Sequence, residues 1–465
     1  MAINLDKKYK YQNKLIFKYN LIIIVILIFI FQISSSFADS WKDNLDSAKF
    51  YQEKYEYKTA LKFAQIALPI VEKEYRITDT NYTNILSQIA EIYYNLGNLD
   101  SAIYYGDNST SLNRKIYTND NTKLAESINS LATFYIAKRN FIKAEPLYIE
   151  SYEMYKRIYK TDNPELAKSI NSLGYFYKIS SNFEKAEKYY SEALEMRRRL
   201  YKTDNPELAS SLNNMALFYK GQSNYIKAEP LYIEALEMRR RLYQTDNPDL
   251  ASSINNLATL YYSMGKLSLA EPLYIEALAM YRRIYKSDHT ELAANINNLA
   301  SFYKNRGDFA NAEIFFNEAL EMRRRLYKTD NPELARNINN LASFYYSNIF
   351  NNNNSNEEDG KNNIKDISKN NNINRAELLF IEALEMRRRL YKTDNPELAN
   401  SMINLANLYF NKGEYAKSEP LYIEGLNMFR KVYKTDNTDL ANGIFCFCNF
   451  SKSPSCSLNN IFFNC

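Results

Sequence analysis

A motif that recurs along most of this chain constrains its fold more than any other feature of the sequence. The 18-residue string EALEMRRRLYKTDNPELA occurs three times in full and once in a near copy. Its tyrosine recurs every 42 residues from Tyr75 to Tyr327, and a single spacing of 64 residues before Tyr391 marks one insertion of 22 residues. A period of about 20 to 50 residues is typical of small structural units that stack on one another. The sequence therefore predicts a repeat array and not a set of independent globular domains.

Each period has the pattern of two helices joined by a short turn. The Asp-Asn-Pro-Glu motif that ends at Glu207 is a helix start signal, because Asn or Asp caps the helix and Pro suits its first position. Apolar residues then follow at helical spacing as far as Tyr219. Residues 221–224 are expected to form the turn, and a second helix begins near Ile226 and runs to the loop before Tyr243.

Small residues recur at fixed positions on both expected helices. In the unit just described they are Ala216 on the first helix and Ala228 and Ala235 on the second. Small side chains allow two antiparallel helices to approach closely, so we expect these positions to be buried. Tyr219, three residues after Ala216, recurs in register and is expected to fill the gap between units.

These residues resemble the tetratricopeptide repeat, and in particular the 42-residue form found in kinesin light chains and in many bacterial repeat proteins. The resemblance rests on residues 213–219, 225–232 and 234–236 with their copies, and it covers roughly residues 40–442. It implies an all-α fold, a right-handed α-solenoid of about nine antiparallel helix pairs whose concave surface is lined by the first helix of each pair. We accordingly expect one solenoid domain over residues 39–442, acting as a non-catalytic scaffold for protein–protein interactions.

The first helix of each repeat carries asparagines on the arc opposite its apolar face. An amide side chain offers both a donor and an acceptor, so it can pair with the backbone of an extended peptide. In kinesin-light-chain-like repeats the matching positions contact cargo peptides, so the resemblance implies a peptide-binding groove. The alternative is that these asparagines only cap helices, bridge neighbouring helices or stay solvated. The candidate groove residues are Asn129, Asn171, Asn213, Asn255, Asn297 and Asn339 in one row, and Asn214, Asn256, Asn298, Asn340 and Asn404 in the next.

Basic residues on the same arc could add selectivity to this groove. Lys168, Lys220 and Arg336 are the candidates. Lys168 and Arg336 occupy the same position of the repeat, and the residue type at this position differs from one repeat to the next. Some members of the family clamp a C-terminal carboxylate, but such a clamp needs several cations close together, and here they are scattered. The expected partners are therefore extended segments of other proteins. The alternative is a structural or self-associating repeat protein, which would stack through its C-terminal end, or a non-catalytic subunit of a larger exported complex.

The composition argues against catalysis, cofactors and metal sites. The chain has one histidine, His289, which stands in place of a loop asparagine and is expected to be exposed. All four cysteines lie in the last twenty residues, at a spacing that matches no standard zinc module. The 59 basic and 54 acidic residues give a net charge of +5, which is too balanced for a nucleic-acid footprint. We expect no enzyme activity, no cofactor and no nucleic-acid partner.

Runs of three arginines, such as residues 239–241, end several of the second helices. Cations suit the C-terminal end of a helix, and Glu237 and Arg241 have the spacing of a favourable pair within one helix. We therefore interpret the runs as solvated helix ends that are offset by the acids of the following loops.

The two ends of the chain and the insertion differ from the repeats. Residues 1–38 combine a lysine-rich start, an apolar run over residues 21–31 and small residues before Ala38, which is the pattern of a secretory signal peptide. If it is not cleaved, residues 15–38 would anchor the chain in a membrane; in both cases the repeats are exported, as a secreted, periplasmic or membrane-anchored protein. The Asn-rich insertion, residues 347–373, is expected to be a disordered loop.

The C-terminal residues 443–465 are rich in cysteine and phenylalanine and interrupt the repeat in the middle of its motif. We interpret them as an aberrant tail that was translated from a shifted frame or a truncated gene. The alternative is a hydrophobic tail that docks on the last unit.

Overall fold

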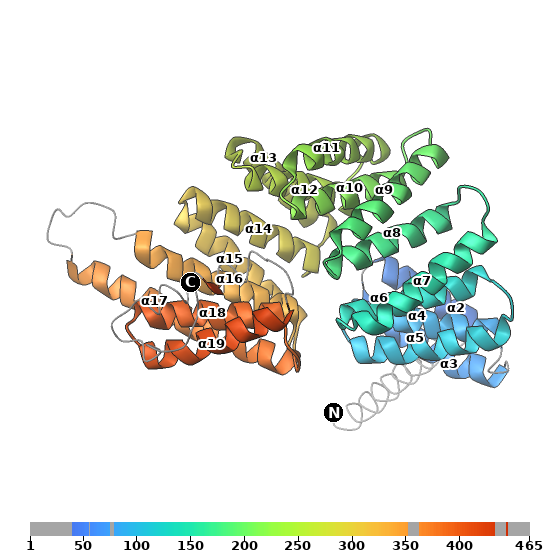
Figure 1. Ribbon diagram of the computed structural model, residues 1–465, viewed down its shortest axis with the longest axis horizontal. Helices are drawn as coiled ribbons and strands as arrows, with labels where there is room; N and C mark the ends of the chain where they lie inside the picture. The colour runs from blue at the N-terminus through green and yellow to red at the C-terminus, as the bar shows by residue number, and fades with distance from the viewer. Residues whose placement is uncertain (1–39, 55, 75–78, 352–361, 433–442, 445–465) are drawn as a thin grey trace, which may run out of the picture. The chain divides into compact units, whose positions relative to one another are not determined.

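A computed structural model describes residues 40–54, 56–74, 79–351, 362–432 and 443–444. These residues form an all-α protein with eighteen helices, in which each even-numbered helix packs antiparallel against the next odd-numbered one (Figure 1). We call the even-numbered helices A helices and the odd-numbered helices B helices. The nine pairs confirm the predicted fold class of stacked helix pairs.

The chain divides into two compact units, Met1–Lys202 and Thr203–Cys465. Within each unit, every B helix also packs against the A helix of the following repeat, so the pairs stack in sequence. The first unit comprises α2 (Trp41–Glu53), α3 (Tyr57–Glu74), α4 (Thr80–Asn95), α5 (Leu99–Ile116), α6 (Thr122–Ala137), α7 (Phe141–Ile158), α8 (Pro164–Ile179) and α9 (Phe183–Leu200). The second comprises α10 (Pro206–Gly221), α11 (Tyr225–Leu242), α12 (Pro248–Ser263), α13 (Leu267–Ile284), α14 (Thr290–Arg306), α15 (Phe309–Leu326), α16 (Pro332–Asn351), α17 (Asn362–Leu390), α18 (Pro396–Asn411) and α19 (Tyr415–Val432).

Local capping explains where the helices begin. The side chain of Asn205 accepts hydrogen bonds from the backbone N–H groups of Glu207 and Leu208 at 2.8 and 3.1 Å, while Pro206 occupies the first position of α10. Asn224 caps α11 in the same way through Lys227. Both helices therefore start where the sequence predicts, because the chain itself supplies acceptors for N–H groups that a helix leaves unpaired.

The small residues are buried at the contacts between helices, as predicted. Ala216, Ala228 and Ala235 are all fully buried. Tyr219 is half-buried and packs against the core of the second unit, with Lys227 over its ring, while Tyr177, Tyr345 and Tyr409 in the same register are buried. Further large buried rings come from its neighbour Phe218 and from Tyr232 on the B helix.

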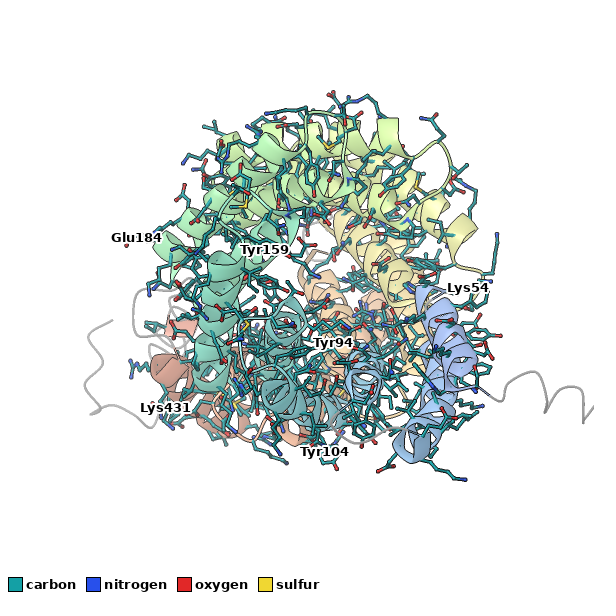
Figure 2. All side chains as sticks on the ribbon, turned by 90° about the vertical axis from the view of Figure 1, so that its right-hand side faces the viewer. Lys54, Tyr94, Tyr104, Tyr159, Glu184 and Lys431 are labelled. Carbon is teal, nitrogen blue, oxygen red and sulfur yellow. The ribbon has the colours of Figure 1, made fainter. Side chains whose placement is uncertain are left out.

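The two faces of a helix pair differ in exposure. In the first unit, Tyr94 projects from the A helix α4, whereas Tyr104 projects from the B helix α5 on the other side of the pair (Figure 2). Tyr104 is 63% exposed. We call the surface formed by successive A helices the A-helix face.

The insertion differs from the prediction at both of its ends. Helix α16 continues to Asn351 and helix α17 begins at Asn362, so residues 347–351 and 362–373 are helical and not irregular. Adding a turn to an existing helix requires no new nucleation, which explains how polar residues extend both helices. Residues 352–361 lie outside the described part of the chain.

Most of the terminal segments, including residues 1–38 and 445–465, also lie outside the described residues. Gly443 and Ile444 pack against Leu426 and Phe429 of α19, and a Cβ atom on Gly443 would come within 3.0 Å of Leu426. None of the described helices has the length and apolar character needed to cross a membrane.

Candidate functional site

The asparagines of the second unit form a hydrogen-bonded ladder along the A-helix face. In each rung the amide Nδ2 of the second-row asparagine donates to Oδ1 of a first-row asparagine in the preceding repeat. The rungs are Asn256 to Asn213 at 3.0 Å, Asn298 to Asn255 at 3.3 Å, Asn340 to Asn297 at 3.2 Å and Asn404 to Asn339 at 3.1 Å. The asparagines therefore bridge neighbouring helices, which is one of the roles that the sequence leaves open.

Each rung uses only part of the hydrogen-bonding capacity of its two amides. In the described chain, Nδ2 of Asn213 and Oδ1 of Asn256 make no hydrogen bond beyond the rung itself. Both side chains are half-buried, and the other first-row asparagines are equally or, for Asn297, more deeply buried. The ladder thus leaves donors on its first row and acceptors on its second row available to a ligand.

The first unit does not continue the ladder between its own repeats. Asn129 and Asn171 lie on α6 and α8, but serines replace the second-row asparagine there. Ser172 donates to the backbone of Lys168 at 3.1 Å and forms no rung. Oδ1 of Asn129 is buried and has no hydrogen-bond partner. Asn214 lies on α10 and is half-buried.

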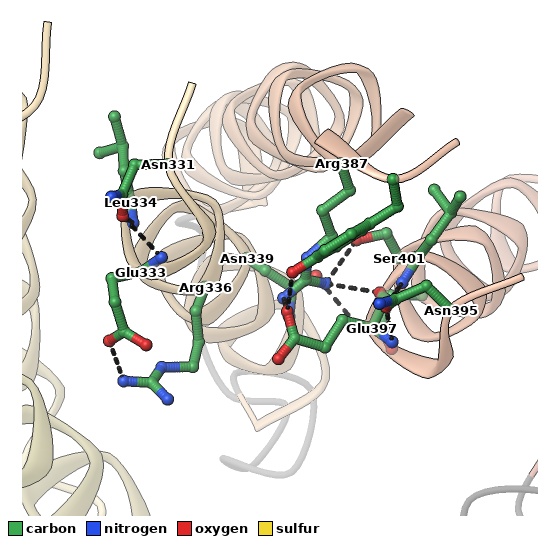
Figure 3. A network of polar contacts seen from close by, with 12 residues as sticks. Asn331, Glu333, Leu334, Arg336, Asn339, Arg387, Asn395, Glu397 and Ser401 are labelled. Carbon is green, nitrogen blue, oxygen red and sulfur yellow. Dashed lines mark hydrogen bonds and ion pairs between the residues drawn. The ribbon is translucent and has the colours of Figure 1, made fainter. Parts of the chain in front are cut away.

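The basic candidates do not gather at one point. Lys168 is exposed on α8 in the first unit, while Lys220 on α10 is half-buried, and burial lowers the pKa of its ammonium group to about 8. Arg336 on α16 pairs with Glu333 one turn earlier (Figure 3). These cations therefore form no clamp among the described residues of either unit.

Sequence reasoning missed a second row of contacts at the C-terminal ends of the A helices. Tyr262 and Lys304 each donate to a backbone carbonyl of the next A helix, namely those of Ser301 at 3.4 Å and Ser343 at 3.5 Å. Both donors sit at the same position of the 42-residue period. A search for polar side chains that recur in this register, regardless of type, would have found them.

The first arginine of each run is buried, which corrects the prediction of solvated helix ends. Arg239 is 4% exposed. Its guanidinium donates to the backbone carbonyl of Asp249 at 2.8 Å, to Oγ of Ser253 at 2.8 Å and to Oγ of Ser210 at 3.0 Å. The planar guanidinium has donors in several directions, so one buried side chain can join the two neighbouring A helices α10 and α12.

The second and third arginines pair with acids in other repeats. Arg240 binds both carboxylate oxygens of Glu276 at 3.0 Å, 36 residues ahead. Arg241 makes a bidentate pair with Asp204 at 2.8 and 2.9 Å, in the loop that precedes its own repeat. The expected acids of the following loop are therefore not the partners of these two arginines, whereas Asp249 lies 3.8 Å from the buried Arg239. Equivalent bidentate pairs join Arg157 to Asp120, Arg199 to Asp162, Arg283 to Asp246, Arg325 to Asp288 and Arg389 to Asp330.

His289 is not exposed as expected, but half-buried. It caps α14 by accepting a hydrogen bond from the backbone of Glu291, and its ring stacks on that of Tyr285 with centroids 3.5 Å apart. Burial lowers the pKa of His289 to about 4, so the ring is neutral at physiological pH. The histidine thus performs the capping role of the asparagine that it replaces.

The first unit contains an open cleft of about 600 Å³ on its A-helix face. Helices α2, α4 and α6 form its walls, and Asn113 of α5 lies among its lining residues. Desolvation raises the pKa of the Glu91 carboxyl in this cleft, and the nearby charge of Glu126 raises it further. Among the described residues, no three His, Cys, Asp or Glu side chains are grouped so that they could hold a metal ion.

A sequence profile of the tetratricopeptide repeat matches residues 123–199, 169–216, 207–283, 291–347 and 369–441, more than half of the chain. A comparison with curated proteins gives no match. Among solved structures, BtubC (BKLC) from P. vanneervenii is 28% identical, with a TM-score of 0.43, and the alignment covers 49% of this chain and 92% of BtubC.

Two further solved structures are similar at lower identity. A putative kinesin light chain with nearly identical repeats from Podosopora anserina is 16% identical, with a TM-score of 0.39, over 50% of this chain and 100% of its own. A Rap protein crystallised with Competence and Sporulation Factor is 15% identical, with a TM-score of 0.47, over 85% and 99% of the two chains.

Proposed function

We infer the function of this chain from one premise: it belongs to the tetratricopeptide repeat family. Proteins of this family typically mediate protein–protein interactions, and the repeats themselves generally carry no catalytic activity. We propose that this chain is a non-catalytic scaffold that binds extended peptide segments of partner proteins along the A-helix face of its second unit.

The observation that carries this proposal is the asparagine ladder. Every rung leaves a donor on one side and an acceptor on the other, which is the pair of groups that each peptide unit of a ligand needs. Packed helices lie about 8–10 Å apart, and an extended chain advances about 3.3 Å per residue, so successive rungs would meet about every third residue of the ligand. The ladder would therefore bind the backbone of the ligand and tolerate many different ligand side chains.

Side chains beside the ladder would then choose among ligands. The position one turn before the first row is Ser210, Ser252, Ala294, Arg336 or Asn400 in the second unit, where the first-row residue that follows Asn400 is Ile403. Only Arg336 is charged, and Glu333 offsets its charge. The favoured segment is accordingly extended, polar and close to neutral.

The proposal is tested with the paired substitution Asn255→Ala and Asn297→Ala. An array of extended ten-residue peptides is screened with the full chain, and the dissociation constants of the best binders are then measured for both proteins. We expect at least a tenfold loss of affinity in the paired variant. Asn317→Ala on the B helix α15 is the matched control, because Asn317 takes no part in the ladder and its Nδ2 donates to the carbonyl of Glu313 in its own helix.

The stability of each protein is measured by thermal melting, since removing two rungs also removes hydrogen bonds between repeats. Unchanged peptide affinity in a folded paired variant would rule out the ladder as the binding surface. A screen without any binder, with light scattering that shows a defined oligomer, would instead favour the self-associating alternative.

We also propose that residues 1–38 direct export of the repeats. The lysine-rich start and the apolar run in the sequence support this. Amino-terminal sequencing of the protein isolated from its own cells tests it: a mature chain that begins near Asp39 is expected, and a chain that begins at Met1 in the cytoplasm would contradict it.

A further inference from the structure

The second unit shows what a buried arginine does between two repeats. Arg387 of α17 donates to the backbone carbonyl of Glu397 at 2.8 Å and to Oγ of Ser401 at 2.6 Å (Figure 3). Arg239 makes the same two contacts with Asp249 and Ser253. The acceptors thus lie ten and fourteen residues after the arginine, and together they form a socket for a guanidinium group.

At the equivalent position of α5 the arginine is replaced by Asn113, three periods before Arg239. Asn113 is 4% exposed, and its Oδ1 is buried without a hydrogen-bond partner. An asparagine side chain is three bonds shorter than an arginine side chain, so it cannot reach the acceptors that Arg239 reaches. Its unpaired oxygen carries an uncompensated desolvation cost until a donor arrives.

The other parts of the socket are present around Asn113. The three partners of Arg239, namely Asp249 through its carbonyl, Ser253 and Ser210, correspond in the first unit to Lys123, Ser127 and Asn84. All three of these residues, and Asn113 itself, line the cleft of about 600 Å³. The cleft therefore lies at the position where the guanidinium of Arg239 lies in its own repeat.

Where other residues replace the arginine in this position, the socket is filled or closed. With Asn113 it stays open. Tyr155 and Tyr281 fill the position with a buried ring. Val71 is small, but the serine position opposite it is occupied by Ile85, which is fully buried. In the described part of the first unit, the socket is thus open only at Asn113.

The three acids that line the cleft, Glu53, Glu91 and Glu126, outnumber its two lysines, Lys49 and Lys123, which favours a cation. Their arrangement differs from that in the second unit. The acid beside Arg239 is Asp249, whose Oδ1 is 3.8 Å away, and its counterpart here is the exposed Lys123. One turn further along α6, Glu126 stands where the second unit has Ser252. Glu91 faces the same space, and the two carboxylates repel each other. A cation between them would relieve this repulsion.

We propose that this cleft binds an arginine side chain of a partner polypeptide, which makes in trans the contacts that Arg239 makes within the chain. Arginine fits better than lysine because the acceptors come from three directions: a carbonyl of α6, the hydroxyl of Ser127 and the oxygen of Asn113. A planar guanidinium with five donors can satisfy them together, whereas an ammonium group has three donors at one point. The inference rests on the proposed function only in that the occupant belongs to a protein partner.

The test uses the full chain and three peptides that differ at one residue. A flexible Gly-Ser peptide carries arginine, lysine or citrulline, the neutral analogue of arginine with nearly the same shape. Binding is followed by the chemical shift of a labelled Asn113 amide. We expect the arginine peptide to bind at least tenfold more tightly than the other two. Equal affinities for the three peptides would overturn the proposal.

Two variants locate the site. Asn113→Arg should fill the socket from within, raise the melting temperature and weaken the arginine peptide at least tenfold, as followed by a fluorescent label on the peptide. Glu126→Gln should weaken the arginine peptide severalfold and leave the citrulline peptide unchanged. If Asn113→Arg fails to fold, Glu126→Gln decides alone, and an unchanged preference for arginine in that variant would contradict the assignment.

The paired variant Asn255→Ala and Asn297→Ala separates this inference from the proposed function. Its substitutions lie in the second unit, so it should keep the full preference for arginine. A chain that binds the arginine peptide but loses its array peptides in the paired variant supports both proposals. If only one of the two effects is absent, only the corresponding proposal fails.

Discussion

The hydroxyl of Tyr148 lies 2.8 Å from that of Thr133, fifteen residues earlier, and joins the two helices of one repeat inside the core. Tyr422 makes the same contact with Asn407. Tyr232 occupies the equivalent position, but the residue fifteen earlier is Leu217, and the buried hydroxyl of Tyr232 has no partner. Two tyrosines that look alike in sequence thus differ in how their polar atoms are satisfied.

We therefore expect opposite outcomes for the same substitution at these two sites. Tyr232→Phe removes an unsatisfied hydroxyl and should leave stability unchanged or raise it by up to about 1 kcal/mol, while Tyr148→Phe should cost about 1 kcal/mol. Urea unfolding of both variants measures the difference. A loss in Tyr232→Phe as large as that in Tyr148→Phe would show that Tyr232 has a partner after all.

Adjacent arginines in one run should differ sharply when each is replaced by lysine. Arg239 is buried and makes three hydrogen bonds that a lysine cannot reproduce together, so Arg239→Lys should cost about 2 kcal/mol or more. Arg240 is largely exposed and pairs with Glu276 at the surface, so Arg240→Lys should cost less than about 1 kcal/mol. Unfolding midpoints in urea give both values, and equal losses would contradict the distinction.

The surface pairs between repeats predict an acid-sensitive contribution to stability. Hydrogen bonds from Arg283 lower the pKa of Asp246 below its ordinary value of 3.8. Because the folded-state pKa is the lower one, the contribution is fully present above the ordinary value and disappears as the pH falls through it to the lowered pKa. Melting temperatures of the wild type and Asp246→Asn should differ at pH 7 and converge as the pH falls below 3.8 through the lowered pKa. A difference that persists in acid would rule out the ion pair as its cause.

The half-buried Lys220 predicts that the stability of the protein depends on pH in the alkaline range. Burial lowers its pKa from 10.5 to about 8, so the unfolded chain binds more protons between these two values. The contribution of this residue to stability therefore rises with pH from about 8 to about 10.5. Lys220→Met should be more stable than the wild type at pH 7 and should lose this rise. Lys202→Met, at an exposed site, is the control and should keep the pH profile of the wild type.

The elements that follow local rules could be predicted from sequence. The helix starts at Pro206 and Tyr225 depend on caps a few residues away, and the burial of Ala216 depends on a period that is visible in the text of the sequence. The asparagine rows were also visible, but their rungs were not. A rung joins residues 43 apart in the chain, and a helical wheel places only residues of the same helix.

The arginine runs were misread for the same reason. The helical wheel shows Glu237 beside Arg241, whereas the partner that binds Arg241 is Asp204, 37 residues back. Among the described arginine runs, Arg325 is the member that comes within 4.0 Å of the acid four residues before it. The open socket at Asn113 could not be predicted from sequence. It is defined by the contacts that Arg239 makes at the equivalent position, and only the structure gives those contacts.

The bidentate Arg–Asp pairs between repeats affect how the number of repeats in such a gene can change. At six successive boundaries of the described chain, from Arg157–Asp120 to Arg389–Asp330, an arginine pairs with the acid of the repeat behind it, so these six pairs are interchangeable. If residues 205–246 were deleted, Arg283 would take the place of Arg241 opposite Asp204, and the seam would close without a mismatch. Unequal crossing-over between near-identical copies can therefore lengthen or shorten the second unit by whole periods without leaving this arginine or this aspartate unpaired.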